Sequence, residues 1–105
     1  MPYQIRRAPQ ARDDIRNFIR HLRREASEEI ARKYFAELEH DIIYLIGNTP
    51  NSFSWFHETG PPYRAKLFRL ARTTYWIIYV VDDENNAVEL VRFWNSAGKP
   101  GTHGL

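Results

Sequence analysis

Hydrophobic positions recur along this chain with two different periods, and each change of period marks the boundary of a predicted element. Residues 2–7 alternate, with Tyr3 and Ile5 on one face, which predicts a short strand. The next apolar residues recur at helical spacing and predict an amphipathic helix that begins near Pro9 and buries Ala11, Ile15, Phe18, Ile19 and Leu22. A second helix is predicted to follow the N-cap Ser27, with an apolar stripe of Ile30, Ala31, Tyr34, Phe35, Leu38, Ile42, Leu45 and Ile46. Gly47 and Pro50 are expected to end this helix.

The second half of the chain predicts three strands in succession. Residues 75–81 are seven apolar or aromatic side chains in a row, too rich in β-branched and aromatic residues for a surface helix. They predict a central strand, flanked by a basic strand at 63–70 and, after the turn formers at 82–86, by an extended run at 87–94. The expected fold class is α+β: an N-terminal strand, an antiparallel helical hairpin, then a three-stranded antiparallel meander. The helices should cover one face of the sheet and leave the other face, or the groove beside the helices, for binding.

Length and composition predict a single domain over residues 1–95, because a chain of 105 residues supports one core. Residues 96–105 contain three glycines and a proline and are predicted to form a flexible tail. The long loop at 48–62 carries Trp55 and Phe56, which are expected to anchor it under the helices. With no cysteine, no apolar signal-peptide core and no membrane-length apolar run, the sequence favours a cytoplasmic protein.

Charge is distributed unevenly along the chain. Residues 1–24 carry seven arginines against two acids, and residues 63–72 carry four basic side chains and no acid. Such concentration favours an anionic partner, either nucleic acid or an acidic protein surface, and a solvated basic face is the alternative. A metal site is not expected, because the sequence has no cysteine and no pair of histidines at i, i+4 among His21, His40, His57 and His103. No cofactor is expected either.

Basic and aromatic residues gather in the predicted sheet, and together they are typical of a surface that neutralises phosphates and stacks bases. They are Arg64, Lys66, Arg69, Arg72, Tyr75, Trp76, Tyr79, Arg92 and Trp94. Strand alternation places Arg69 on the face opposite Arg64 and Lys66, so these residues cannot all face one way. The alternative interpretation is that the aromatic rings are core and that the basic residues are solvated edge positions.

Several short motifs keep an order and spacing that suggest a family. They are the helix start at Ala8-Pro9 with Asp13-Asp14-Ile15, then Gly60-x-x-Tyr63-Arg64, Tyr75-x-Ile77-x-Tyr79-x-Val81-Asp82 and Val88-x-Leu90-Val91-Arg92-Phe93-Trp94. Over residues 3–95 this arrangement resembles the ParE/RelE superfamily of bacterial type II toxins. The resemblance implies a small toxin of the predicted fold, neutralised in a hetero-oligomer by a cognate antitoxin whose C-terminal segment wraps it.

The superfamily divides by target, and the resemblance favours one branch. RelE-like members are ribosome-dependent endoribonucleases that cut messenger RNA with phosphate-binding basic residues and a late Tyr or His. ParE-like members bind DNA gyrase and do not catalyse. Here Trp76 stands where nuclease relatives often have arginine, and the last strand ends Phe93-Trp94-Asn95 without that Tyr or His. The ParE-like, non-enzymatic function is therefore the leading prediction; the endoribonuclease is the alternative, and a non-toxic relic binding module is the third.

Candidate site residues follow from the pattern and the resemblance together. Contact with the target or with nucleic acid is predicted for Arg64, Lys66, Arg69, Arg72 and Trp94. In the nuclease alternative, the catalytic set is Arg64, Lys66, Arg69, Arg72 and Arg92. Antitoxin binding is predicted for Trp76 and for one face of the first helix, Arg12, Arg16, Arg20 and Arg23. No membrane partner is expected.

Overall fold

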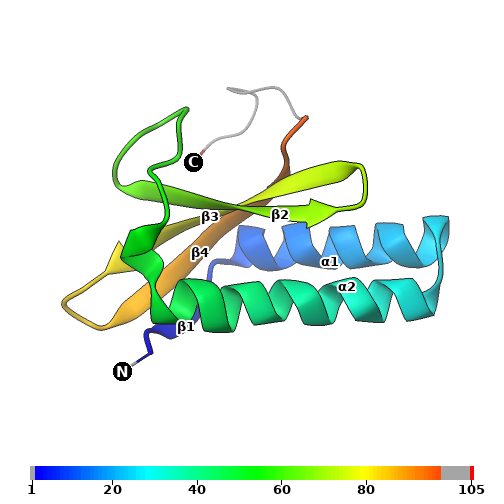
Figure 1. Ribbon diagram of the computed structural model, residues 1–105, viewed down its shortest axis with the longest axis horizontal. Helices are drawn as coiled ribbons and strands as arrows, with labels where there is room; N and C mark the ends of the chain where they lie inside the picture. Colours follow the sequence, from blue (N-terminus) through cyan, green and yellow to red (C-terminus); the bar gives the residue numbers. More distant parts are fainter. Residues whose placement is uncertain (1, 98–104) are drawn as a thin grey trace.

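The computed structural model describes residues 2–97 and 105 and has the α+β order that the sequence predicts (Figure 1). Two helices stand between the first strand and a run of three strands. The chain-order elements are β1 Gln4–Arg7, α1 Pro9–Glu25, α2 Glu28–His40, a π-helical segment η1 Asp41–Ile46, a 3-10 turn η2 Pro50–Ser52, β2 Tyr63–Leu70, β3 Thr73–Asp82 and β4 Ala87–Asn95. None of the helices described is both long and apolar enough to span a bilayer.

The helix boundaries follow local chemistry at three of their four ends. Pro9 occupies the first turn of α1, and the Ser27 hydroxyl accepts the Ile30 N–H at 3.1 Å to cap α2. The expected stop at Gly47 is wrong, because its φ of −62° is right-handed helical and the helical backbone continues to Asn48. The helix ends before Pro50, which has no backbone N–H to continue the helical hydrogen bonds. At this end the Thr49 hydroxyl donates to the Leu45 carbonyl at 2.9 Å.

The four strands form one sheet in the order β1-β4-β3-β2. β3 lies antiparallel to both β2 and β4, as a meander requires, with Trp76 opposite Leu67 on one side and Trp94 on the other. β1 joins the edge of β4 in parallel, with Ile5 opposite Val88. The helical hairpin supplies the long crossover that a parallel pair needs. Sequence patterning did not reveal this parallel pairing.

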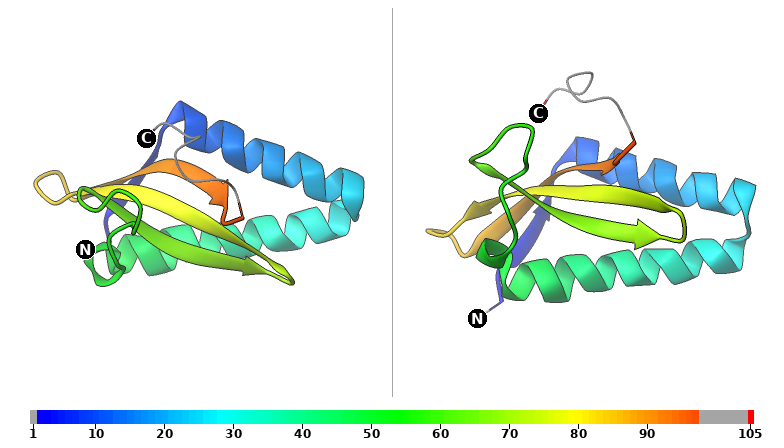
Figure 2. Two further views of the ribbon diagram at one scale, coloured as in Figure 1. Left: turned by 90° about the horizontal axis from the view of Figure 1, so that it is seen from above. Right: turned by 45° about the horizontal axis from the view of Figure 1, so that its top comes forward.

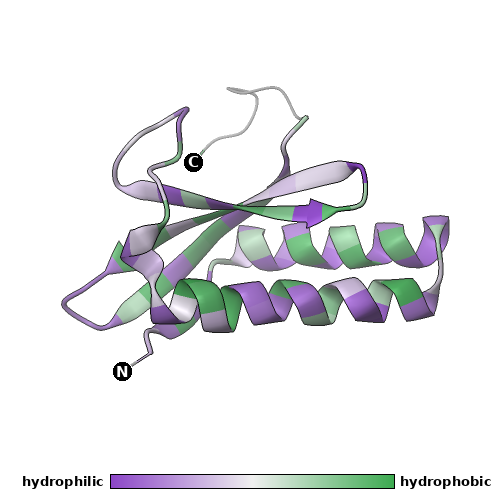
Figure 3. Ribbon diagram, in the orientation of Figure 1, coloured by the Kyte–Doolittle hydropathy of each residue, from purple (hydrophilic) through white to green (hydrophobic). Residues whose placement is uncertain are grey.

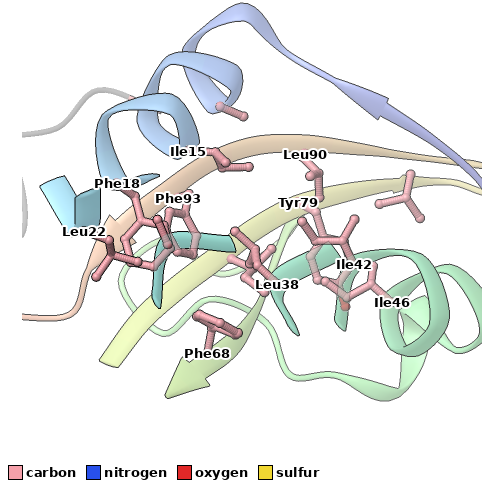
Figure 4. Close-up of a cluster of buried hydrophobic side chains, with 14 residues drawn as sticks. Ile15, Phe18, Leu22, Leu38, Ile42, Ile46, Phe68, Tyr79, Leu90 and Phe93 are labelled. Carbon is pink, nitrogen blue, oxygen red and sulfur yellow. The ribbon is translucent and has the colours of Figure 1, made fainter. Parts of the chain in front are cut away.

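Both helices cover one face of the sheet, and most of the core lies between the two layers (Figures 1 and 2). Apolar and polar positions alternate around α1 and α2, so each helix has one face to bury (Figure 3). Phe18 of α1 packs edge-on against Phe93, with ring centroids 5.1 Å apart (Figure 4). Tyr79 is fully buried, and its hydroxyl donates to the Pro50 carbonyl at 2.7 Å. Burial raises the pKa of Tyr79, which keeps this donor protonated.

The other face of the sheet carries a second, smaller core, which corrects the expectation that this face is free. The loop after η2 crosses it and places Phe56, only 1% exposed, against Ile78 and Trp94. Phe56 therefore anchors the loop on the face opposite the helices, not under them. Trp55 stays 46% exposed, and the Arg64 guanidinium lies 3.7 Å from its ring centroid.

A single carboxylate closes the edge of β4 where β1 ends. β1 pairs with β4 only as far as Leu90, so the Phe93 N–H has no strand partner on that side. The Asp14 carboxylate of α1 accepts this N–H at 3.0 Å and pairs with the Arg92 guanidinium at 2.7 and 2.9 Å. These hydrogen bonds raise the pKa of Arg92. Asp14 thus takes the place of the missing strand partner.

We expect the second core to be essential for stability. Phe56→Ala should lower the free energy of unfolding by about 3–5 kcal/mol, because it empties the centre of that cluster. Trp55→Ala, one residue away on an exposed ring, should cost about 1 kcal/mol or less. Urea denaturation of the two variants measures the difference, and equal losses would contradict the placement of the two rings.

The Asp14 contact also predicts a difference between neighbouring acids. Asp14→Asn should destabilise the protein by about 1–3 kcal/mol, because it leaves the partly buried Arg92 without its counter-charge. Asp13→Asn is the matched control, since the Asp13–Arg16 pair is 66% exposed on both side chains. Its cost should stay within about 0.5 kcal/mol. Thermal unfolding of both variants checks this, and a neutral Asp14→Asn would refute the edge-closing role.

Candidate functional site

A groove runs between α1 and α2, with an apolar floor and an arginine rim. Its volume is about 450 Å³. The floor consists of Ile15, Ile19, Ala31 and Phe35, and the rim of Arg7, Arg12, Arg16, Arg23 and Arg32. Phe35 is 42% exposed, so the groove offers a large apolar side chain to solvent. Such a surface fits an amphipathic segment with acidic side chains.

Helical periodicity builds this groove from the sequence. Arg12, Arg16 and Ile19 follow one another at spacings of four and three on α1, which places them on one stripe. The rim arginines pair with Asp13, Glu28 and Glu39, and the closest contact, Arg7 to Glu39, is 2.6 Å. Four of the five rim arginines therefore share three carboxylates. Among the described residues, Arg12 forms no ion pair. The rim remains positively charged.

The predicted antitoxin residues are only partly brought together. Arg12, Arg16 and Arg23 line the groove, whereas Arg20 does not. Trp76 lies on the opposite sheet face, with its ring centroid 5.7 Å from that of Phe56. Phe35 is a surface residue, although its position in the apolar stripe of α2 predicted a core side chain.

The π-helical segment also changes which side chains are exposed. Leu45 was expected in the buried stripe of the second helix, but it is 40% exposed. Ile43 and Tyr44 are likewise exposed, whereas Ile42 and Ile46 are fully buried. The wider π turn shifts the register of the stripe, since it holds more residues per turn than an α-helix. The sequence carries no clear signal for this shift.

Three of the basic residues predicted for phosphate binding are engaged inside the protein. Arg64 donates to the Phe53 carbonyl at 2.6 Å, and Lys66 pairs with Asp41 at 2.9 Å. Arg92 is held by Asp14, as described above. Each of the three is partly buried, and the contact of each is with a helix or with the loop after η2. These charges mainly position secondary structure.

The other predicted contacts are divided between exposed and buried positions. Arg69 lies on the outer sheet face and Arg72 in the turn between β2 and β3, and both are exposed. Within the described ranges neither forms an ion pair or a side-chain hydrogen bond. Trp94 is only 8% exposed and packs in the second core, which leaves its ring little surface for a partner.

His57 is a candidate that sequence analysis considered only as a metal ligand. The loop carries it over the outer face, where its ring lies 5.4 Å from that of Trp76. Its side chain is 64% exposed, and Nε2 lies 3.7 Å from a Glu58 oxygen. An exposed imidazole gives this face one side chain of a type that general acid–base catalysis uses. No sequence signal could place it there, because the position depends on the path of the loop.

Metal binding has no support from the described part of the chain. There, no group of three or more His, Cys, Asp or Glu side chains gathers closely enough to hold an ion. Two surfaces whose side chains suit binding are the groove between the helices and the outer face of the sheet, where Arg69 is exposed.

Comparisons with known proteins identify the family. No curated protein matches the sequence. Among solved structures, the fold is similar to a chain of the chromosomal ParDE system from P. aeruginosa, with a TM-score of 0.68 and 14% identity over 89% of this chain and 95% of that one. It is also similar to a chain of the RelBE2 toxin–antitoxin complex from Mycobacterium tuberculosis, with a TM-score of 0.60 and 16% identity over 93% and 95%. The family model of the ParE toxin of the parDE type II toxin–antitoxin system matches residues 5–100. The chain therefore belongs to the ParE toxin family.

Proposed function

We propose that this toxin stops growth by binding DNA gyrase and that it does so without catalysis. The observation that carries the proposal is the internal engagement of Arg64, Lys66 and Arg92, three of the five residues that a nuclease would use to orient phosphates. Binding a topoisomerase needs a complementary surface, whereas RNA cleavage needs a base, an acid and a stabiliser of phosphate charge. The target places the proposed activity in the cytoplasm.

Ribosome-dependent RNA cleavage is the second candidate, and His57 is the observation that favours it. In such a reaction the 2′-hydroxyl attacks its own phosphate, so one group removes a proton and another protonates the leaving oxygen. His57 carries an exposed imidazole over the outer face, and Arg69 is an exposed cation on the same face of the sheet. Glu58, whose carboxylate oxygen lies 3.7 Å from His57 Nε2, is a second titratable side chain beside it.

We propose further that a cognate antitoxin neutralises the protein at the groove between α1 and α2. The two similar solved structures described above come from toxin–antitoxin systems. An amphipathic antitoxin segment would place apolar side chains on Ile19 and Phe35 and acidic side chains on the arginine rim. This assignment keeps Arg12, Arg16 and Arg23 from the sequence prediction and replaces Arg20 and Trp76 by Phe35.

The choice of target is tested with purified protein and a single variant. The wild-type chain should inhibit DNA supercoiling by gyrase and leave cleaved DNA, and it should not cut messenger RNA on stalled ribosomes. His57→Ala should retain growth arrest within about twofold, because a binding surface loses little when one exposed ring is removed. A nuclease would lose about a hundredfold or more. Unchanged supercoiling together with His57-dependent RNA cleavage would refute the gyrase proposal.

The groove makes a separate prediction about the antitoxin. The double variant Arg12→Ala/Arg16→Ala should weaken antitoxin binding by roughly tenfold to a hundredfold and reduce its dependence on salt. Arg20→Ala is the matched control, since it removes an arginine of the same helix that does not line the groove. Isothermal titration at low and high salt measures both effects. Equal losses for Arg20→Ala would show that the total charge matters and the groove does not.

A further inference from the structure

Three consecutive large apolar side chains lie at the surface of η1, at the end of α2 that is far from the turn between the two helices (Figure 1). Ile43 is 48% exposed, Tyr44 59% and Leu45 40%, and we call these three residues the η1 patch. Apolar side chains that are exposed singly are normal on a protein surface, whereas adjacent ones mark places where another molecule binds.

The π-helical backbone of η1 presents this patch. Leu38, Ile42 and Ile46 are fully buried and follow one another at a spacing of four residues. A π turn holds more residues than an α turn, so the three residues between Ile42 and Ile46 all fall outside the core. Single π turns inside helices are frequent at functional sites. The exposure of the patch therefore follows from the geometry of η1, because the core residues on either side of it keep their places.

The part of the chain that carries the patch has no cation of its own. Residues 34–63 contain no lysine or arginine, although the chain has fifteen, and their acids are Glu37, Glu39, Asp41 and Glu58. Glu39 pairs with Arg7 at 2.6 Å and Asp41 with Lys66 at 2.9 Å, so these two carboxylates are neutralised from the sheet. Glu37 is exposed and forms no ion pair with any residue that the structure describes. The charge left on this side of α2 is negative.

Glu37 and His40 extend the patch along the helix. Glu37, His40 and Tyr44 follow one another at spacings of three and four, which places them on one side of the helix. The His40 ring centroid lies 5.0 Å from that of Tyr44, and both side chains are exposed. The surface is thus a strip that is apolar at η1 and acidic at Glu37.

This combination of apolar and acidic groups distinguishes among the possible partners. An acidic segment that suits the arginine rim of the groove would meet Glu37 with like charge. A second copy related by a two-fold axis would set the strip against itself and supply no cation for Glu37. A basic and apolar surface of another protein matches both the patch and the charge beside it.

We propose that the η1 patch and Glu37 bind a basic, apolar surface of the toxin's target, which is DNA gyrase in the function proposed above. The inference rests on that function and adds the place of contact. Neither Glu37 nor any residue of the patch lines the groove between α1 and α2. The target and the antitoxin are therefore assigned to different surfaces of the toxin.

Inhibition of DNA supercoiling by purified gyrase tests the apolar part of the surface. Ile43→Ala/Tyr44→Ala should raise the toxin concentration for half-inhibition by about tenfold or more, because it removes two exposed contact side chains. The fold should persist, since both side chains are exposed and alanine favours a helix, and thermal unfolding checks this. Trp55→Ala is the matched control: it removes a ring that is 46% exposed in the loop after η2. This control should change the half-inhibition concentration by no more than about twofold.

A pair of charge variants tests the acidic part. Glu37→Lys should weaken gyrase inhibition by about fivefold or more at low salt, because it sets a cation against a basic surface. Glu29→Lys makes the same charge change at an exposed position in the first turn of α2 and should stay within about twofold. Equal effects of the two variants would show that net charge matters and the position of Glu37 does not.

The remaining outcomes separate this inference from the function on which it rests. If the wild-type chain inhibits gyrase and the double variant does so equally well, the patch is not the target surface and the gyrase proposal stands. If the wild-type chain does not inhibit gyrase, both are wrong. Loss of affinity for the cognate antitoxin in the double variant, measured by isothermal titration, would assign the patch to the antitoxin. Concentration-dependent self-association of the wild-type chain that the double variant abolishes would assign it to a second copy, and either result overturns the proposal.

Discussion

Burial of β3 on both faces is the constraint on which the rest of the structure depends. Ile77 and Tyr79 face the helices, while Ile78 faces the loop, and each is at most 1% exposed. A strand covered on both sides reads as a continuous apolar run instead of an alternating one. The helical hairpin covers only one face of β3, so the other face needs a second layer of apolar side chains. The loop from η2 to β2 supplies that cover through Phe56.

This second cover determines where surfaces remain for partners. It fills the part of the outer face around Ile78 and Trp94, and it pairs with the first half of β2. In the described part of the chain, the groove between the helices and the exposed side of His57 remain open. The same loop that completes the core therefore also limits the places at which another protein can bind.

Partly buried ion pairs connect the helical layer to the sheet. Arg92 of β4 joins Asp14 of α1, Lys66 of β2 joins Asp41 at the end of α2, and Arg7 of β1 joins Glu39 of α2. Each pair links a strand to a helix, and Lys66 and Arg92 belong to the set that the sequence predicted as a nucleic-acid surface. In a low-dielectric setting such residues are costly to leave unpaired, so their contacts are structural. Basic charge that remains for partners includes that of Arg12, Arg16, Arg69 and Arg72.

Local pattern and tertiary context contributed differently to these results. The sequence by itself determined the α+β class, the order of elements, the Ser27 cap and the antiparallel meander, because helical and strand periods and capping chemistry act over a few residues. It also placed Arg12, Arg16 and Arg23 on one helix face. Only the tertiary structure decided that β1 pairs in parallel with β4, that Phe56 covers the outer face, and that Arg64, Lys66 and Arg92 are held internally. Those outcomes depend on contacts between residues far apart in the chain, for which neither periodicity nor composition carries a signal.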